Sequence, residues 1–200
     1  HFAAAMAAAQ KRDAGAGELL SAVAMDPAQP DIVRASALSR LSGRAVSEAV
    51  RAGLKDDSAL VRMAALRALQ SAMPHERVAL AAPLLSDPVR AVRVEAARLS
   101  AAVPAESLSP RERAAYHRAM EELIAFHRAS ADRPEAQVSL AAVYADLGQV
   151  DLALAALETA LRLDPRFVPA LVNLADLHRS LGQDARAEML LRQAMDFAPA

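Results

Sequence analysis

The most regular spacing of hydrophobic positions lies near the middle of the chain. Hydrophobic side chains after residue 109 fall near one stripe of a helix, namely Tyr116, Met120, Leu123, Ile124 and Phe126, followed by His127. Ser109 as N-cap, Pro110 in the first helical position and Glu112 three residues after the cap are typical of a helix start. The pattern therefore predicts one long amphipathic helix within residues 109–133.

The segment that follows contains a sequence repeat of two copies, with a period of 34 residues. The first copy has Leu140, Ala141, Tyr144, Gly148, Ala153, Leu157, Ala160 and Pro165, and the second has Leu174, Ala175, His178, Gly182, Ala187, Leu191, Ala194 and Pro199 at the same places. The alanines at 153 and 187 let two antiparallel helices approach closely. The glycines allow a tight turn after the first helix, and the prolines end the second.

This spacing resembles the tetratricopeptide (TPR) repeat. The copies depart from the family at His178, where Tyr is usual, and at Gln137 and Leu171, where Trp is frequent. The resemblance implies two helices per copy, with the first helices lining a concave groove that holds a protein or peptide. Its groove positions correspond to Glu135, Val138, Ser139, Ala142, Ala145 and Asp146 in the first copy, and to Pro169, Val172, Asn173, Asp176, Arg179 and Ser180 in the second.

Several of these groove residues argue against one known use of the family. Some TPR proteins grip a carboxyl terminus with Lys, Arg and Asn, and only Asn173 and Arg179 fit that pattern here. Asp146 and Asp176 have the wrong charge. The alternative interpretation is that the groove residues bind no partner and form the solvated face of a structural spacer.

The first half repeats a Val-Arg-x-x-Ala segment at intervals of 28 and 31 residues. The segments start at Val33, Val61 and Val92. A shorter helical stretch precedes each segment, and an Asp-containing turn joins the two, which predicts three helix hairpins. The arrangement is similar to short HEAT-like repeats. That resemblance implies that each Arg pairs with a turn Asp, namely Asp57 with Arg62, Asp87 with Arg93, and Asp26 or Asp31 with Arg34.

Together these patterns predict an all-α fold, a right-handed α-solenoid of helix hairpins. We expect HEAT-like repeats over residues 1–104, a junction helix that is a degenerate TPR helix over 105–133, and two TPR repeats over 134–200. The boundary is placed at residues 103–110. Composition agrees, because 54% of residues are hydrophobic, Ala and Leu dominate, and only 3% are aromatic.

Charge and cysteine content narrow the function. The formal net charge is −1 and there is no Cys, so we expect no nucleic-acid partner, no disulfide and no haem attachment in this chain. No apolar run reaches the length of a membrane span, so we expect no membrane insertion. His117 and His127 are ten residues apart, whereas a metal-binding pair on a helix needs three or four. We therefore expect no metal, no cofactor and no catalytic residue.

The sequences of the two repeat types, and their order along the chain, resemble the C-terminal region of bacterial multihaem cytochrome c proteins. That resemblance implies an exported, periplasmic parent in electron transfer, with haem bound only in a domain upstream of His1; a cytoplasmic location is the alternative. We expect a non-catalytic interaction or scaffold module belonging to a longer protein. The alternatives are a spacer or oligomerisation element, with a homodimer through the terminal helix at 185–197, and a HEAT-repeat enzyme such as a bilin lyase-like protein.

Overall fold

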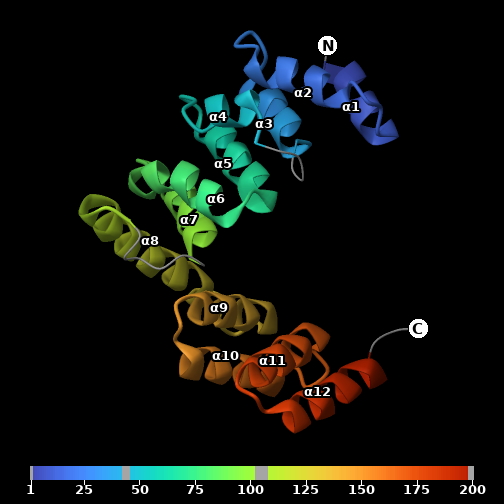
Figure 1. Cartoon of the computed structure of the whole chain (residues 1–200), viewed down its shortest axis with the longest axis vertical. Helices are drawn as coiled ribbons and strands as arrows, with labels where there is room; N and C mark the ends of the chain where they lie inside the picture. Colours follow the sequence, from blue (N-terminus) through green and yellow to red (C-terminus); the bar gives the residue numbers. More distant parts are fainter. Residues whose placement is uncertain (1, 42–45, 102–107, 198–200) are drawn as a thin grey trace. The chain divides into compact units, whose positions relative to one another are not determined.

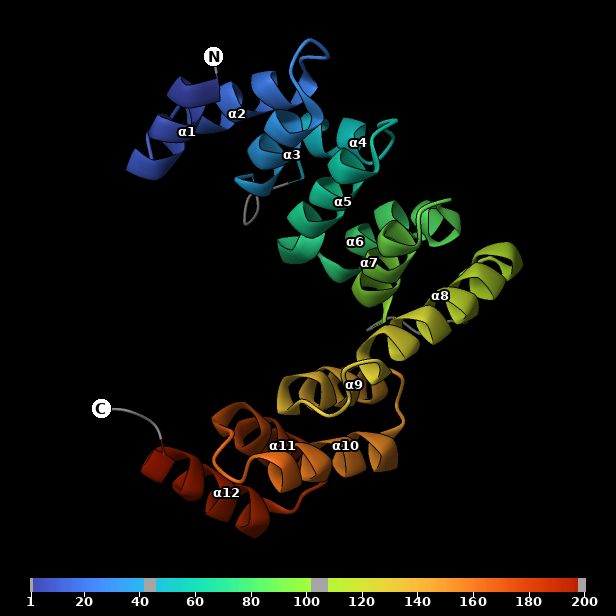
Figure 2. The same ribbon diagram turned by 180° about the vertical axis from the view of Figure 1, so that it is seen from behind.

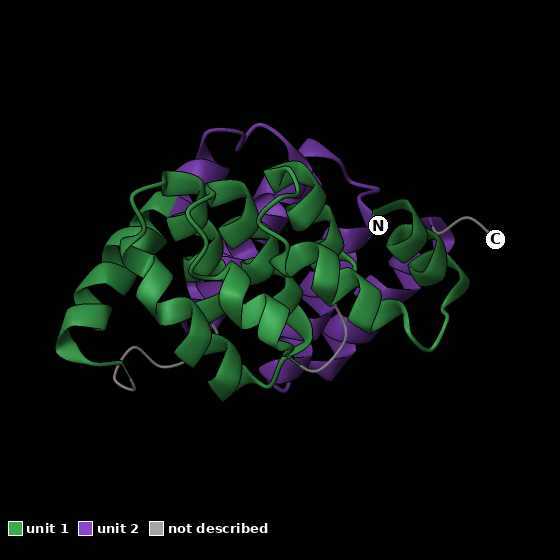
Figure 3. Cartoon of the chain, turned by 90° about the horizontal axis from the view of Figure 1, so that it is seen from above, with its two compact units in different colours: residues 1–122 green, residues 123–200 purple. Residues whose placement is uncertain are grey.

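The computed structural model describes residues 2–41, 46–101 and 108–197. The secondary-structure elements of these residues are all helices, and the described residues contain no strand. The predicted all-α helical-repeat fold is therefore confirmed. The chain divides into two compact units, unit 1 with residues 1–122 and unit 2 with residues 123–200 (Figure 3). The division falls inside α8 (Pro110–Arg128).

Unit 1 is a series of helix hairpins. Its helices before α8 are α1 (Phe2–Lys11), α2 (Ala16–Met25), α3 (Asp31–Ser39), α4 (Glu48–Gly53), α5 (Ala59–Ala68), α6 (Pro74–Ala81) and α7 (Arg90–Ser100), with 3₁₀ turns at Leu69–Ser71 and Ala82–Ser86. The three Val-Arg-x-x-Ala segments form α3, α5 and α7, which pack in succession (Figures 1 and 2). The helices α2, α4 and α6 each pack against the one that follows, which closes the predicted hairpins.

The repeated alanine of the three segments is fully buried. Ala37, Ala65 and Ala96 occupy the same position in the three segments, and none of them exposes any surface. Val61 and Val92 are also fully buried. A methyl side chain at this position lets neighbouring helices pack at short distance, which explains why all three segments have alanine there.

The arginines of the repeated segments link consecutive hairpins. Arg62 donates from Nε and Nη2 to the carboxylate of Asp87, at 2.7 and 3.0 Å, in the turn of the next hairpin. Its Nη1 donates to the main-chain carbonyls of Asp56 and Asp57 in its own turn, at 2.8 and 2.9 Å. Arg34 pairs in the same forward sense with Asp56.

Two of the predicted partners are therefore wrong. Arg93 pairs with the carboxylate of Glu122 at 2.9 Å, and it meets Asp87 only at the main-chain oxygen, at 2.8 Å. Arg62 likewise reaches only the main-chain oxygen of Asp57. Because one guanidinium nitrogen is held by carbonyls of its own turn, the others extend to the following hairpin. The predicted pair of Arg34 with Asp31 is present at 2.7 Å.

Helix α8 begins at the predicted cap. The main-chain N–H of Ser109 donates to Glu112 Oε2 at 3.0 Å, and the N–H of Glu112 donates to Ser109 Oγ at 3.4 Å. The Ser109 hydroxyl also donates to Glu112 Oε2, and this hydrogen bond, with the one from the Ser109 main-chain N–H, lowers the pKa of the Glu112 carboxyl. The helix ends at Arg128, and Phe126 of the predicted stripe is exposed. Most of the boundary predicted at 103–110 lies outside the described residues, and the three-domain division stays a prediction.

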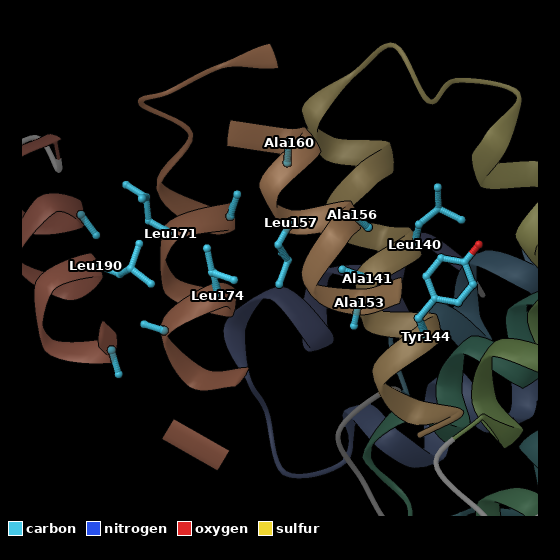
Figure 4. Close-up of a cluster of buried hydrophobic side chains, with 14 residues drawn as sticks. Leu140, Ala141, Tyr144, Ala153, Ala156, Leu157, Ala160, Leu171, Leu174 and Leu190 are labelled. Atoms are coloured by element: carbon cyan, nitrogen blue, oxygen red, sulfur yellow. The ribbon is translucent and has the colours of Figure 1, made fainter. Parts of the chain in front are cut away.

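Unit 2 contains the two predicted copies. Their helices are α9 (Pro134–Asp146), α10 (Val150–Leu163), α11 (Val168–Ser180) and α12 (Asp184–Phe197), and each packs on the next. Gly148 and Gly182 have φ of +70° and +72° at the turn inside each copy, a backbone region that favours glycine. Pro165 follows α10 as expected, whereas Pro199 lies outside the described residues. The repeated positions form the core, including Leu140, Tyr144, Leu157, Leu171 and Leu174 (Figure 4).

Candidate partner-binding groove

Unit 2 has a hollow of about 320 Å³ between the first helices of its two copies. It is lined by Ala141, Ala142 and Ala145 from α9, Leu157 from α10, and Asn173, Asp176, Leu177 and Ser180 from α11. Two of these lining residues, Ala141 and Leu157, also belong to the buried core of unit 2 (Figure 4). The lining is mostly carbon, with the polar groups supplied by α11.

The hollow exists because three side chains on α9 are methyl groups. The second copy has Asp176 and Arg179 where the first has Ala142 and Ala145, 34 residues earlier. Asp176 and Arg179 form an exposed ion pair at 2.5 Å. This pair holds the Asp176 side chain at the edge of the hollow while the alanines leave its centre open.

The structure brings some of the predicted groove residues together and leaves others apart. Of the predicted groove positions, Ala142, Ala145, Asn173, Asp176 and Ser180 line the hollow. The remaining positions lie on α9 and α11 without lining it, namely Glu135, Val138, Ser139, Asp146, Pro169, Val172 and Arg179. The binding role of the whole set stays a prediction.

Polar groups at the hollow differ in how free they are to bind. Ser180 Oγ donates to the main-chain oxygen of Leu177 at 2.7 Å, and Asp176 is paired with Arg179. In the described part of the chain, no hydrogen bond involves the side-chain amide of Asn173, which can both donate and accept. Asn173 is therefore the polar group best able to meet a partner's main chain.

Three lining residues were not predicted as groove residues, namely Ala141, Leu157 and Leu177. Ala141 and Leu157 are signature positions, and both are buried. Signature positions of a repeat are predicted as core residues, so Ala141 and Leu157 were assigned to the core, although each also borders the hollow. The sequence feature that could have indicated the hollow is the group of alanines at 141, 142 and 145, because these small side chains leave space beside α9.

Other kinds of site were sought across the described residues. No group of three or more His, Cys, Asp or Glu side chains there has the arrangement of a metal site. Within residues 2–41, 46–101 and 108–197, no helix has the length and hydrophobicity needed to cross a membrane. Burial lowers the pKa of His127, whose ring lies edge-on to Phe126 at 5.2 Å between centroids.

Comparison with known proteins identifies the class of the second unit. The family model for the tetratricopeptide repeat matches residues 145–200, from the last turn of α9 through α12. No curated protein and no solved structure matches the chain. The match confirms the TPR resemblance over residues 145–200 and indicates a module for protein–protein interaction. The HEAT-like repeats, the relation to multihaem cytochromes and the periplasmic location stay predictions.

Proposed function

We propose that unit 2 binds a segment of a partner protein in the hollow between α9 and α11. The observation that carries the proposal is the hollow itself, open to solvent beside the alanines of α9 and edged by Asn173 and Asp176. An apolar surface that is concave and bordered by a few polar groups is the usual form of a binding site.

The volume sets the size of the partner's anchor. About 320 Å³ is near the lower end of the range for ligand sites, so the hollow fits one or two apolar side chains. Burying one Val, Leu or Ile side chain contributes about 1.5–3 kcal/mol. The free amide of Asn173 then donates to, or accepts from, the main chain of the bound segment, which fixes its direction.

The ion pair beside the hollow limits which segments fit. Because Asp176 and Arg179 neutralise one another, the edge attracts neither a strongly acidic nor a strongly basic segment. A carboxyl-terminal group would meet the Asp176 carboxylate next to Asn173. We therefore propose an internal, apolar segment as the occupant.

A peptide selection tests this function on the full chain. Random peptides displayed on phage are selected for binding, and the selected peptides are then titrated by fluorescence polarisation. Ala145→Phe fills the hollow from an exposed position, and we expect at least about tenfold weaker binding with an unchanged melting temperature. The matched control is Ala155→Phe, at an exposed position of α10 that does not line the hollow.

Charge reversal gives a second, independent readout. The double variant Asp176→Arg with Arg179→Asp keeps an ion pair while it reverses the polarity of the edge, so stability should hold and the selected peptides should bind less tightly. If the selected peptides bind Ala145→Phe and the double variant with the same affinity as the parent chain, this groove is not the docking surface. That result would favour the spacer alternative.

A further inference from the structure

Helices α3, α5 and α7 of unit 1 carry a second surface that the proposed function does not use. They pack side by side, and their residues can be aligned on the repeated arginines Arg34, Arg62 and Arg93. Two sets of equivalent positions then stand out, one set five residues after each arginine and one set two residues before it.

The first set forms a polar row. Ser39, Arg67 and Arg98 are the equivalent residues, and all three line one open hollow of about 500 Å³ together with Gln70, Ser71 and Glu95. Arg98 donates to the Glu95 carboxylate at 2.7 and 3.3 Å. No hydrogen bond or ion pair involves the Arg67 guanidinium in the residues that the structure describes, and this side chain is exposed.

The second set forms an apolar row. Ile32, Leu60 and Ala91 are the equivalent residues, and the two larger side chains are 60% and 45% exposed. Each lies seven residues before its partner in the polar row. Seven residues are nearly two helical turns, so both rows lie on the same face of their helices, about 10.5 Å apart.

The spare charge on this surface distinguishes Arg67 from the repeated arginines of the same helices. The guanidiniums of Arg34, Arg62 and Arg93 are bound to carboxylates that join the hairpins, and they contribute to the fold. Arg67 has no such role. The surface therefore has an unpaired cation, Arg67, with exposed Ile and Leu side chains two helical turns away. A complementary ligand is acidic along one edge and apolar along the other.

We propose that the α3–α5–α7 surface binds an amphipathic helix of a partner protein. The helix lies across the three helices, with carboxylates on one edge at Arg67 and Arg98 and apolar side chains on the other edge against Ile32 and Leu60. The distance between the rows is close to the 10–12 Å diameter of a helix with its side chains. Arg67 is the main anchor, because Arg98 already shares its charge with Glu95.

The same observations weigh against a nucleic acid as the ligand. A phosphate backbone is bound by several unpaired basic residues, whereas this hollow contains one unpaired Arg and the Glu95 carboxylate. Exposed Ile32 and Leu60 add nothing to phosphate binding. A protein helix uses both rows.

The test measures binding of a defined probe to the full chain by fluorescence polarisation. The probe is a fluorescein-labelled synthetic helix with glutamates along one edge and leucines along the other, and its counterpart has glutamine in place of glutamate. We expect the acidic probe to bind, the glutamine probe to bind at least about tenfold more weakly, and added salt to weaken the acidic probe. Arg67→Glu and Arg67→Gln should each reduce binding by about tenfold or more.

A control variant separates binding at this surface from a general effect of the chain's charge. Arg118→Glu changes the same charge at an exposed position of α8 and should leave binding unchanged. Arg67 is in the last turn of α5, where a cation suits the helix dipole, so melting curves accompany both variants. Leu60→Ser should also weaken binding. The proposal is overturned if the acidic probe fails to bind, if Arg67→Glu and Leu60→Ser bind it like the parent chain, or if labelled duplex DNA binds through Arg67 more tightly than the probe.

Discussion

Replacing Arg62 by Ala is the most direct test of how the hairpins of unit 1 are joined. Only 11% of the Arg62 side chain and 3% of the Asp87 side chain are exposed, and two hydrogen bonds join them. The Arg62→Ala variant leaves Asp87 buried with a single recorded donor, the N–H of Val89 at 2.8 Å. It also removes the two bonds from Arg62 to main-chain carbonyls in its own turn.

The expected loss follows from the burial of the charge left behind. Breaking a buried ion pair by removing one partner destabilises a protein by about 3–5 kcal/mol, because the remaining ion stays desolvated. For a unit of this size that corresponds to a fall in melting temperature of roughly 10–20 °C. The double variant Arg62→Met with Asp87→Leu removes both charges, so it should recover most of the loss although the carbonyl contacts are gone.

Calorimetry and circular dichroism at 222 nm check this prediction, and an exposed ion pair supplies the comparison. Arg192 and Glu188 on α12 are paired at 2.5 Å with side chains 76% and 65% exposed, so Arg192→Ala should cause no measurable change. If Arg62→Ala melts within a degree or two of Arg192→Ala, the forward ion pairs do not hold the hairpins together and the account of unit 1 is wrong.

Two further predictions concern unit 2. Gly182→Ala should destabilise it by about 1–2 kcal/mol, because alanine is strained at a φ of +72°, whereas Gly15→Ala, at φ −83° with open space around the added methyl, should change little in a denaturant titration. Burial lowers the folded-state pKa of His127, so the unfolded chain binds more protons below about pH 6.5 and stability should fall as the pH drops through the lowered pKa. Melting temperatures taken near neutrality and near pH 5 should show a smaller drop in His127→Gln; an equal drop in both chains would contradict the assignment.

The helices of unit 2 and the start of α8 were predictable because each depends on local chemistry. Glycine at 148 and 182 predicts a turn that other residues adopt with strain, and the structure has both in that conformation. Ser109 and Glu112 predict a helix start within four residues of sequence, and the reciprocal hydrogen bonds are present. Features of this kind need no knowledge of distant parts of the chain.

The polar contacts between hairpins were less predictable. Sequence spacing placed a turn Asp near each arginine, but the direction of a long side chain depends on which acceptors already hold part of it. Arg62 and Arg93 use the main-chain oxygens of their own turns, and their carboxylate partners come from the next hairpin or from α8. Leu157 was missed as a lining residue of the hollow in unit 2 for a related reason, since it serves the core and the hollow at once.

The forward ion pairs of unit 1 have a consequence for how such a chain can change length. A turn carboxylate accepts from the arginine of the hairpin before it, as Asp56 does from Arg34 and Asp87 from Arg62. The arginine of the last hairpin, Arg93, donates to Glu122 of α8. Removing or duplicating one whole hairpin would leave every remaining arginine opposite an acidic group. Insertions and deletions in units of one hairpin would therefore create no unpaired charge, whereas a deletion that removed a turn carboxylate and kept the arginine of the preceding hairpin would.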